Sequence, residues 1–306
     1  TYVEGGSVFG TNPQGDVVYA AALMSQIAGK PVRMQFMRWD EHGWDNYGPA
    51  ELMDIRGAAD AAGNITGTEY TQFGIPGFST IPSSHMAGAE TIVISTTANG
   101  DSNNSGTQYA IPNRRVVTKT LPLANNYFKT APLRAPQALH ACWGYEQMID
   151  ELAYAAKMDP AAFRLKNIAS LDRELALGLT TLTYNRWKSA LVDVMSRSNW
   201  QAKVANSVAQ TGDVRKGRGI ALGTFTGTQA AAVVDIEVSL KTGKILAKEV
   251  WVSQDNGISM YLDGGINNSL GAVVQGVSRA LWEGVNFNTK YVTGLDWVTY
   301  PMLRFK

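Results

Sequence analysis

The stretch AAAVVDIEVSLKTGKILAKEVWV, residues 230–252, decides the fold class of this chain. From Ala232 to Leu240 every second residue is apolar and most of the residues between are polar, which is the pattern of a strand with one buried face. Residues 241–244, Lys-Thr-Gly-Lys, predict a turn, and residues 245–252 predict the strand that returns from it. The stretch therefore predicts an antiparallel β-hairpin.

Four helices are predicted around this hairpin from apolar spacing and capping residues. They are an N-terminal helix from Asn12 and Pro13 to Gly29, a long helix after Pro136, a short helix from Asp159 and Pro160 through Leu165, and a last helix along Ile266, Leu270, Val273, Val277 and Leu281. Residues 32–36 alternate as a strand does, and residues 60–115 predict turns and short strands with an exposed excursion near 98–108. Strands and helices follow no strict alternation, so we expect an α+β fold class with two packed mixed α/β halves.

The change of composition after residue 169 suggests where the two halves meet. Residues 170–212 have a helical and then a polar pattern, and glycine-containing pairs near residues 212–218 interrupt it. We therefore predict a first half at 1–169, a helical connector at 170–212 and a second half at 213–306.

Charge and cysteine content narrow the functional classes. The formal net charge is +1, which gives no electrostatic reason to expect nucleic-acid binding, and no apolar run approaches the length of a membrane span. The single cysteine, Cys142, cannot hold an iron–sulfur cluster, and the three histidines lack metal-ligand spacing. We expect no metal held directly by side chains. The compartment, cytoplasm or periplasm, stays open.

Three segments carry candidate binding residues. The glycine-rich residues 5–10 precede a predicted helix, where the backbone can approach an anionic ligand closely. Arg134 and Ala135 precede the second helix, and the guanidinium can donate several hydrogen bonds to an anionic or oxo ligand. Asn268 is predicted at the start of the last helix, where its amide can bind the edge of a heterocycle. A tight turn, a surface arginine and simple helix capping are the competing explanations.

The order of these segments resembles the molybdopterin-binding subunit of the xanthine dehydrogenase/aldehyde oxidase family. Residues 5–10, Gly-Gly-Ser-Val-Phe-Gly, are similar to that family's Gly-Gly-Gly-Phe-Gly loop. The other similar segments, in the same order, are Arg134 through Glu146, Asp150-Glu151-Leu152, Asp159-Pro160, Phe163-Arg164, Asn167, Val234 to Gly243, Asp255-Asn256-Gly257, Gly271 to Gly276, Glu283 and Tyr300-Pro301. Within the family, the chain most resembles the isoquinoline 1-oxidoreductase beta-subunit group.

This resemblance implies a function and a set of site residues. Family members are oxidoreductases that hydroxylate an aldehyde or an N-heteroaromatic substrate with oxygen from water, using a molybdopterin-type molybdenum cofactor. The implied cofactor-binding residues are Gly5, Gly6, Phe9, Gly10, Arg134, Ala135 and Asn268. Electrons are implied to leave through iron–sulfur clusters or haem on a partner chain, so an iron–sulfur or cytochrome subunit is the expected partner.

The chain also departs from the family pattern. The loop is one residue longer, Asn268 is shorter than the usual glutamine, and the Gly-Gln-Gly motif is absent. The general-base glutamate is expected beyond Lys306, which leaves the second half C-terminally incomplete and the catalytic residue unknown. Because the chain begins with Thr1, we expect the missing segments on the same subunit or on a split partner, and no turnover by these residues alone. The alternatives are a non-catalytic scaffold without cofactor and a hydrolase with Thr1 as nucleophile.

Overall fold

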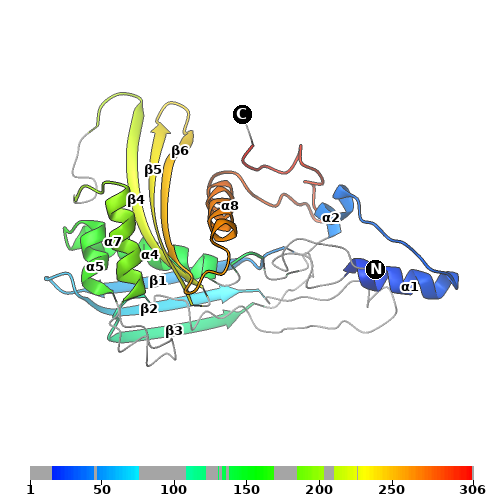
Figure 1. Cartoon of the computed structure of the whole chain (residues 1–306), viewed down its shortest axis with the longest axis horizontal. Coiled ribbons are helices and arrows are strands. Elements are labelled where there is room, and N and C mark those ends of the chain that lie inside the picture. Colours follow the sequence, from blue (N-terminus) through cyan, green and yellow to red (C-terminus); the bar gives the residue numbers. More distant parts are fainter. Residues whose placement is uncertain are drawn as a thin grey trace.

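Two three-stranded sheets with helices packed against them form the computed structural model (Figure 1). The residues that the structure describes are 16–44, 47–75, 108–121, 130, 133–135, 138–168, 185–202, 210–225 and 227–304. This architecture confirms the predicted α+β class. The predicted Asn12 cap, the glycine-rich loop at 5–10 and most of the excursion near 98–108 lie outside the described residues.

The first sheet begins with a hairpin that the sequence patterns did not predict. Its strands, in spatial order, are β1 (Glu51–Ala59), β2 (Ile65–Gly74) and β3 (Asn113–Thr120). β1 and β2 are antiparallel, whereas β2 and β3 pair in parallel. The carboxylate of Asp60 closes the hairpin by accepting hydrogen bonds from the backbone N–H groups of Ala62 and Asn64. Gly63 has φ +79°, which glycine adopts without a steric penalty.

The second sheet contains the predicted hairpin and one further strand. Its strands are β4 (Val214–Phe225), β5 (Thr228–Ser239) and β6 (Ile245–Asp255), and all are antiparallel. The buried face of β5 differs from the expectation: Ala231 and Val233 are buried, whereas the predicted face from Ala232 is only partly buried. The Ala-Ala-Ala-Val-Val run is apolar on both faces, so alternation could not distinguish them. A β-bulge between Asp235 and Ile236 then shifts the register.

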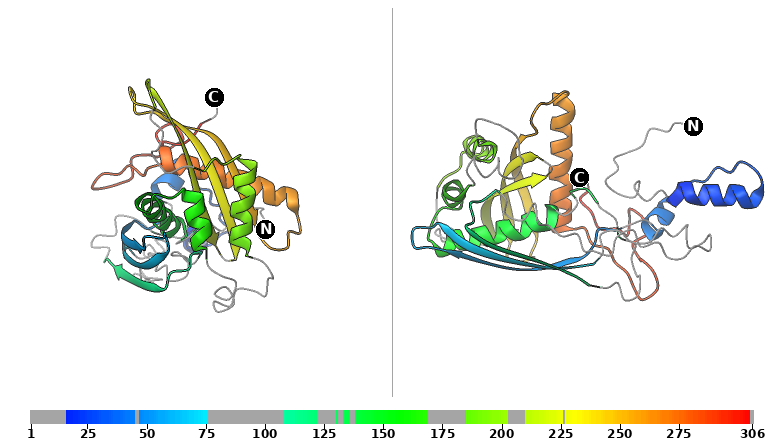
Figure 2. Two further views of the ribbon diagram at one scale, coloured as in Figure 1. Left: turned by 90° about the vertical axis from the view of Figure 1, so that its left-hand side faces the viewer. Right: turned by 90° about the horizontal axis from the view of Figure 1, so that it is seen from below.

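Three of the described helices lie against the sheets, α4 (Ala138–Ala155), α7 (Arg186–Arg197) and α8 (Leu262–Leu281), and a fourth, α5 (Pro160–Asn167), packs against α4 and α7. α4 contacts both β1 and β4, and α7 packs against β5 and β6 (Figure 2). α7 falls inside the segment predicted as a helical connector, and it covers the second sheet. α8 stands beside β6, at the open edge of this sheet (Figure 1).

Two further helices form the far end of the molecule in Figure 1, α1 (Asp16–Ala28) and α2 (Arg38–Trp44). Gly29 has φ +61° directly after α1, as expected for the residue that ends a helix. The prediction of a strand at residues 32–36 is wrong: the segment between the helices alternates in exposure but forms no ladder with another described strand. α2 contacts the C-terminal region, where the rings of His42 and Trp297 meet edge to face at 4.9 Å.

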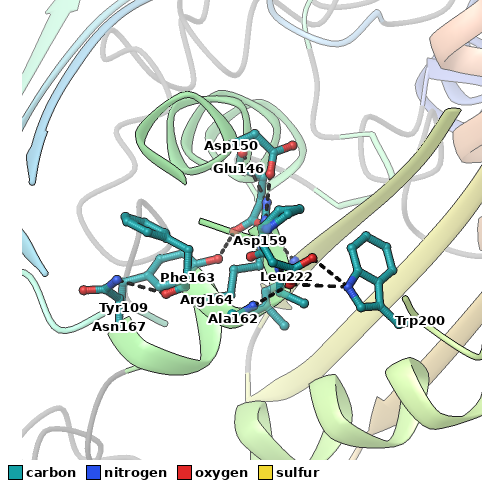
Figure 3. Close-up of polar contacts among 12 residues, drawn as sticks. Tyr109, Glu146, Asp150, Asp159, Ala162, Phe163, Arg164, Asn167, Trp200 and Leu222 are labelled. Atoms are coloured by element: carbon teal, nitrogen blue, oxygen red, sulfur yellow. Dashed lines mark hydrogen bonds and ion pairs between the residues drawn. The ribbon is translucent and has the colours of Figure 1, made fainter. Parts of the chain in front are cut away.

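One hydrophobic core joins the two sheets. Tyr70, Tyr145, Ile149, Leu222 and Val233 are among its fully buried members and come from β2, α4, β4 and β5. α4 also carries a buried carboxylate into this core (Figure 3).

That carboxylate belongs to Glu146, and it accepts hydrogen bonds from four donor groups (Figure 3). Its Oε1 accepts from Tyr109 Oη at 2.7 Å and Gln108 Nε2 at 3.1 Å, and its Oε2 accepts from Arg164 Nε and the backbone N of Leu222, each at 2.9 Å. Burial and the Glu146 charge raise the pKa of Tyr109 well above its usual value. Burial alone would lower the pKa of Arg164, but the charge of Glu146 raises it on balance. The Arg164 guanidinium therefore keeps its charge, and the hydrogen bonds of Glu146 tie α4 and α5 to β4.

Candidate functional site

The predicted site residue Arg134 lies against α8, although 134 positions separate it from its nearest partner there. Arg134 Nη2 donates to the backbone oxygen of Asn268 at 3.0 Å and to its Oδ1 at 2.7 Å. Arg134 Nη1 donates to Gln275 Oε1 at 3.4 Å. Asn268 and Gln275 are seven positions apart, about two helical turns, so both amides lie on one face of α8. The structure thus brings two of the three predicted segments together.

The backbone next to Arg134 has an unusual conformation. Ala135 has φ +63°, a left-handed value that is uncommon for a residue with a Cβ atom. Two hydrogen bonds hold this turn: Arg279 Nη1 donates to the carbonyl oxygen of Arg134 at 3.2 Å, and Leu139 N donates to that of Ala135 at 3.3 Å. Residues held in this region of φ often belong to binding sites. The strain at Ala135 therefore supports a ligand-facing role for the turn.

Unused donors surround the Arg134 guanidinium. Within the described part of the chain, Arg134 Nε, Asn268 Nδ2 and Gln275 Nε2 take part in no hydrogen bond. These groups are N–H donors, and one belongs to a permanent cation. An anionic ligand rich in acceptor atoms fits such a donor set. A pterin that carries oxo and phosphate oxygens is a ligand of this kind.

Two titratable residues, His140 and Glu51, lie next to the same turn. His140, in the first turn of α4, has its Nδ1 3.5 Å from Oε2 of Glu51, whose side chain is 1% exposed. Burial lowers the pKa of His140, and the nearby Arg279 guanidinium lowers it further. His140 is therefore neutral at pH 7. The sequence indicated only that this histidine lacks metal-ligand spacing, and it gave no sign of the contact with Glu51.

No group of three or more His, Cys, Asp or Glu side chains suitable for holding a metal ion occurs among the described residues. The thiol of Cys142 instead points to the Leu222 carbonyl oxygen at 3.1 Å, inside the packed region between α4 and β4. The described helices also include none long and apolar enough to span a bilayer.

The remaining predicted site residues have different outcomes. Gly5, Gly6, Phe9 and Gly10 lie outside the described residues, so their convergence with Arg134 stays a prediction. Asn268 was predicted at the start of the last helix, with helix capping as the competing explanation, but it neither lies at the start of that helix nor caps it.

The reason is that α8 begins at Leu262, so that Asn268 lies in its second turn and uses its side chain to bind Arg134. Sequence reasoning missed Arg279. Its spacing of eleven positions from Asn268 places it on the same helical face, and this spacing could have revealed it.

A groove of about 820 Å³ lies between α7, β6 and α8, away from Arg134. Its α8 wall consists mainly of the apolar Leu262, Ile266, Leu270 and Val273. At 100° per residue this face of α8 points away from Asn268 and Gln275. The groove and the Arg134 cluster are therefore on opposite sides of one helix, and no candidate site residue lines the groove.

Comparison with known proteins places this geometry in a family context. Residues 4–168, more than half of the chain, match the molybdopterin cofactor-binding domain. A nicotinate dehydrogenase subunit of Pseudomonas putida is 30% identical over 99% of the chain and 25% of its own length. A membrane-bound aldehyde dehydrogenase [pyrroloquinoline-quinone] of Gluconacetobacter polyoxogenes is 28% identical over 96% of the chain and 37% of its own length.

The isoquinoline 1-oxidoreductase beta chain of Brevundimonas diminuta is 24% identical over 52% of the chain and 18% of its own length. The expected closeness to that group is therefore wrong, since the nicotinate dehydrogenase subunit is more similar over nearly the whole chain. The chain spans about a quarter of that relative's length. Among solved structures, a Cu,Mo-CO dehydrogenase matches 93% of the chain and 57% of its own, with TM-score 0.68 and 9% identity, which supports the fold alone.

Proposed function

The chain belongs to the molybdopterin cofactor-binding domain family of xanthine dehydrogenase/aldehyde oxidase type enzymes, and from this premise we propose that it forms part of the cofactor site of a molybdenum hydroxylase. The observation that carries the proposal is the meeting of Arg134, Asn268 and Gln275, each with an N–H donor that bonds to no residue in the described part of the chain. We assign these residues to binding and orienting the cofactor. When bound, such a cofactor supplies a molybdenum centre that transfers oxygen and accepts two electrons.

The chemistry of the residues fits a binding role. Amide and guanidinium groups donate hydrogen bonds but take up no proton at neutral pH. Arg134 therefore offsets negative charge on the cofactor, and the amides fix its orientation. We assign proton transfer to a glutamate other than the residues named here, as the family resemblance implied. The glycine-rich loop at residues 5–10 is assigned to the same site.

The substrate class is an aldehyde or an N-heteroaromatic compound. The names of the relatives, nicotinate dehydrogenase and aldehyde dehydrogenase, include both. We propose an iron–sulfur or cytochrome subunit as the electron-transfer partner, since the single cysteine Cys142 cannot hold a cluster. Two of the relatives are themselves subunits of larger dehydrogenases, which supports an enzyme with several chains.

Arg134→Ala tests the proposal directly. In the complete enzyme, purified with its partner chains, this substitution should lower bound molybdenum, measured by mass spectrometry, and hydroxylase activity by tenfold or more, as expected when a charge-assisted bond worth about 1.5–3 kcal/mol is lost. The midpoint of global unfolding should change little, because Arg134 and α8 lie outside the hydrophobic core that joins the two sheets.

Arg197→Ala is the matched control, since Arg197 is an exposed arginine on α7 that pairs only locally with Asp193. It should leave molybdenum content and activity unchanged. Full molybdenum loading and full activity in Arg134→Ala would remove Arg134 from the site. A wild-type enzyme that holds no molybdenum would favour the non-catalytic scaffold.

A further inference from the structure

One helix grips Arg134 at two separate points. Asn268 and Gln275 hold its guanidinium, and Arg279 holds its backbone carbonyl oxygen. The three α8 residues are spaced by seven and four positions, so they project from one face of the helix. Hydrogen bonds to α8 thus hold both the side chain and the backbone of Arg134.

The carbonyl that Arg279 binds belongs to the peptide that joins Arg134 to Ala135. Rotation about φ of Ala135 swings this peptide, and that φ has the strained value of +63°. A hydrogen bond from a permanent cation to the carbonyl stabilises the strained orientation. Without it, the peptide is free to rotate toward an ordinary φ, and the Arg134 side chain turns with it.

Apolar packing gives α8 little support of its own. Ser278 is its one fully buried residue, whereas Ile266, Leu270 and Val274 are 49%, 60% and 56% exposed. The position of α8 against the turn therefore depends on polar contacts rather than on a packed interface. Loss of one such contact is not compensated by neighbouring apolar contacts.

We infer that Arg279 is a positioning residue, which sets the orientation of Arg134 by locking the turn at Ala135 onto α8. The inference rests on the proposed function only in the identity of the ligand that Arg134 binds. The lock itself is a property of this chain and can be tested without a cofactor.

The pKa of His140 measures whether Arg279 is in place, because Arg279 is one of two described charged groups that face this histidine. Glu51 faces it from β1, and Arg279 faces it from α8. Burial and the Arg279 charge both lower its pKa. If Arg279 leaves its place, His140 loses a repulsive neighbour, and its pKa rises toward the ordinary value of about 6.5.

The experiment compares Arg279→Gln with Arg279→Lys, which keeps the charge, and with Arg197→Gln as a surface control. The His140 pKa is followed by NMR titration of the three histidines, with His140→Gln used for assignment. We expect a higher His140 pKa in Arg279→Gln and a value near that of the wild type in Arg279→Lys and in the control. Amide exchange of Leu139, which donates to Ala135, should become about tenfold faster in Arg279→Gln, as expected for the loss of one charge-assisted hydrogen bond.

An unchanged His140 pKa together with unchanged Leu139 exchange in Arg279→Gln would overturn the inference. Should Arg279→Gln fail to fold, Arg279→Met takes its place, because it also removes both the charge and the hydrogen bond to the Arg134 carbonyl oxygen, and a wild-type His140 pKa with wild-type Leu139 exchange in that variant would overturn the inference. Molybdenum content of the complete wild-type enzyme is measured in parallel. A wild type without molybdenum contradicts the proposed function and leaves the lock intact, whereas a loaded wild type with an unchanged His140 pKa and unchanged Leu139 exchange in Arg279→Gln contradicts the lock alone.

Discussion

Glu146 and Arg164 form the most deeply buried ion pair of the described residues, with exposed side-chain fractions of 7% and 0%. Removing one member of such a pair leaves the other charged and unpaired. We therefore predict that Arg164→Met lowers the free energy of unfolding by about 3–5 kcal/mol, measured by urea titration. The double variant Glu146→Gln/Arg164→Met should recover part of this loss, because the unpaired carboxylate is gone.

The control for this prediction is Arg197→Met, which removes an exposed arginine from its pair with Asp193. Exposed pairs of this kind contribute little to stability, so the urea midpoint should hardly move. Equal losses in Arg164→Met and Arg197→Met would show that the buried network does not carry the stability assigned to it.

Ala135 gives a second prediction at the level of single residues. Its φ of +63° costs little for glycine and much more for a β-branched side chain. Ala135→Val should therefore be less stable than Ala135→Gly by about 1–3 kcal/mol in chemical unfolding. Identical unfolding curves for the two variants would mean that the turn is not strained in solution.

The family pattern named Arg134, Ala135 and Asn268 one by one, and their assignment to a cofactor site stays a prediction. The pattern could not predict the contact between Arg134 and Asn268, because more than 130 positions separate them and only the docking of α8 brings them together. Arg279 and His140 carry no motif, and their part in the site depends on burial and on neighbouring charges. For Gly5, Gly6, Phe9 and Gly10 the site assignment remains a prediction.

Among the elements, α5 owes its start to one side chain. Asp159 Oδ1 accepts from the backbone N of Ala161 at 3.0 Å and of Ala162 at 2.9 Å, and Asp159 Oδ2 accepts from Trp200 Nε1 at 3.1 Å (Figure 3). We predict that Asp159→Ala lowers stability by about 0.5–2 kcal/mol, read from the thermal midpoint. Asp159→Asn keeps a capping oxygen and should retain most of the stability that Asp159→Ala loses. An Asn variant as unstable as the Ala variant would argue against the cap.

Among the helices and strands, the sequence predicted those whose position is specified by residues that are neighbours in the chain. The hairpin of β5 and β6 and the start of α5 are specified by neighbouring residues, and both were predicted. The start of α8 was placed too late, because Tyr261 before it provides no capping side chain. Residues 32–36 alternate as a strand does, but a strand also needs a partner, and a local pattern cannot supply one.

For the whole molecule, the shared core has a measurable consequence. Tyr145 and Ile149 from α4 pack in one cluster with Leu222 and Val233 of the second sheet. We predict a single cooperative unfolding transition, with coincident curves from circular dichroism, from tryptophan fluorescence and from calorimetry. Two resolved transitions would instead support independent folding of the predicted halves at 1–169 and 213–306, a division that otherwise stays a prediction.

The hydrogen-bond partners of the buried Glu146 carboxylate are synthesised at different times, because the ribosome adds residues in sequence order. Tyr109 precedes it and Arg164 soon follows, but the N–H of Leu222 comes 76 residues later. At about 5–20 residues per second, translation takes roughly 4–15 seconds to cover that interval. During it, the α4 residues that pack against β4 lack that partner. We therefore expect the nascent chain to pass through an interval in which this apolar surface is exposed to aggregation.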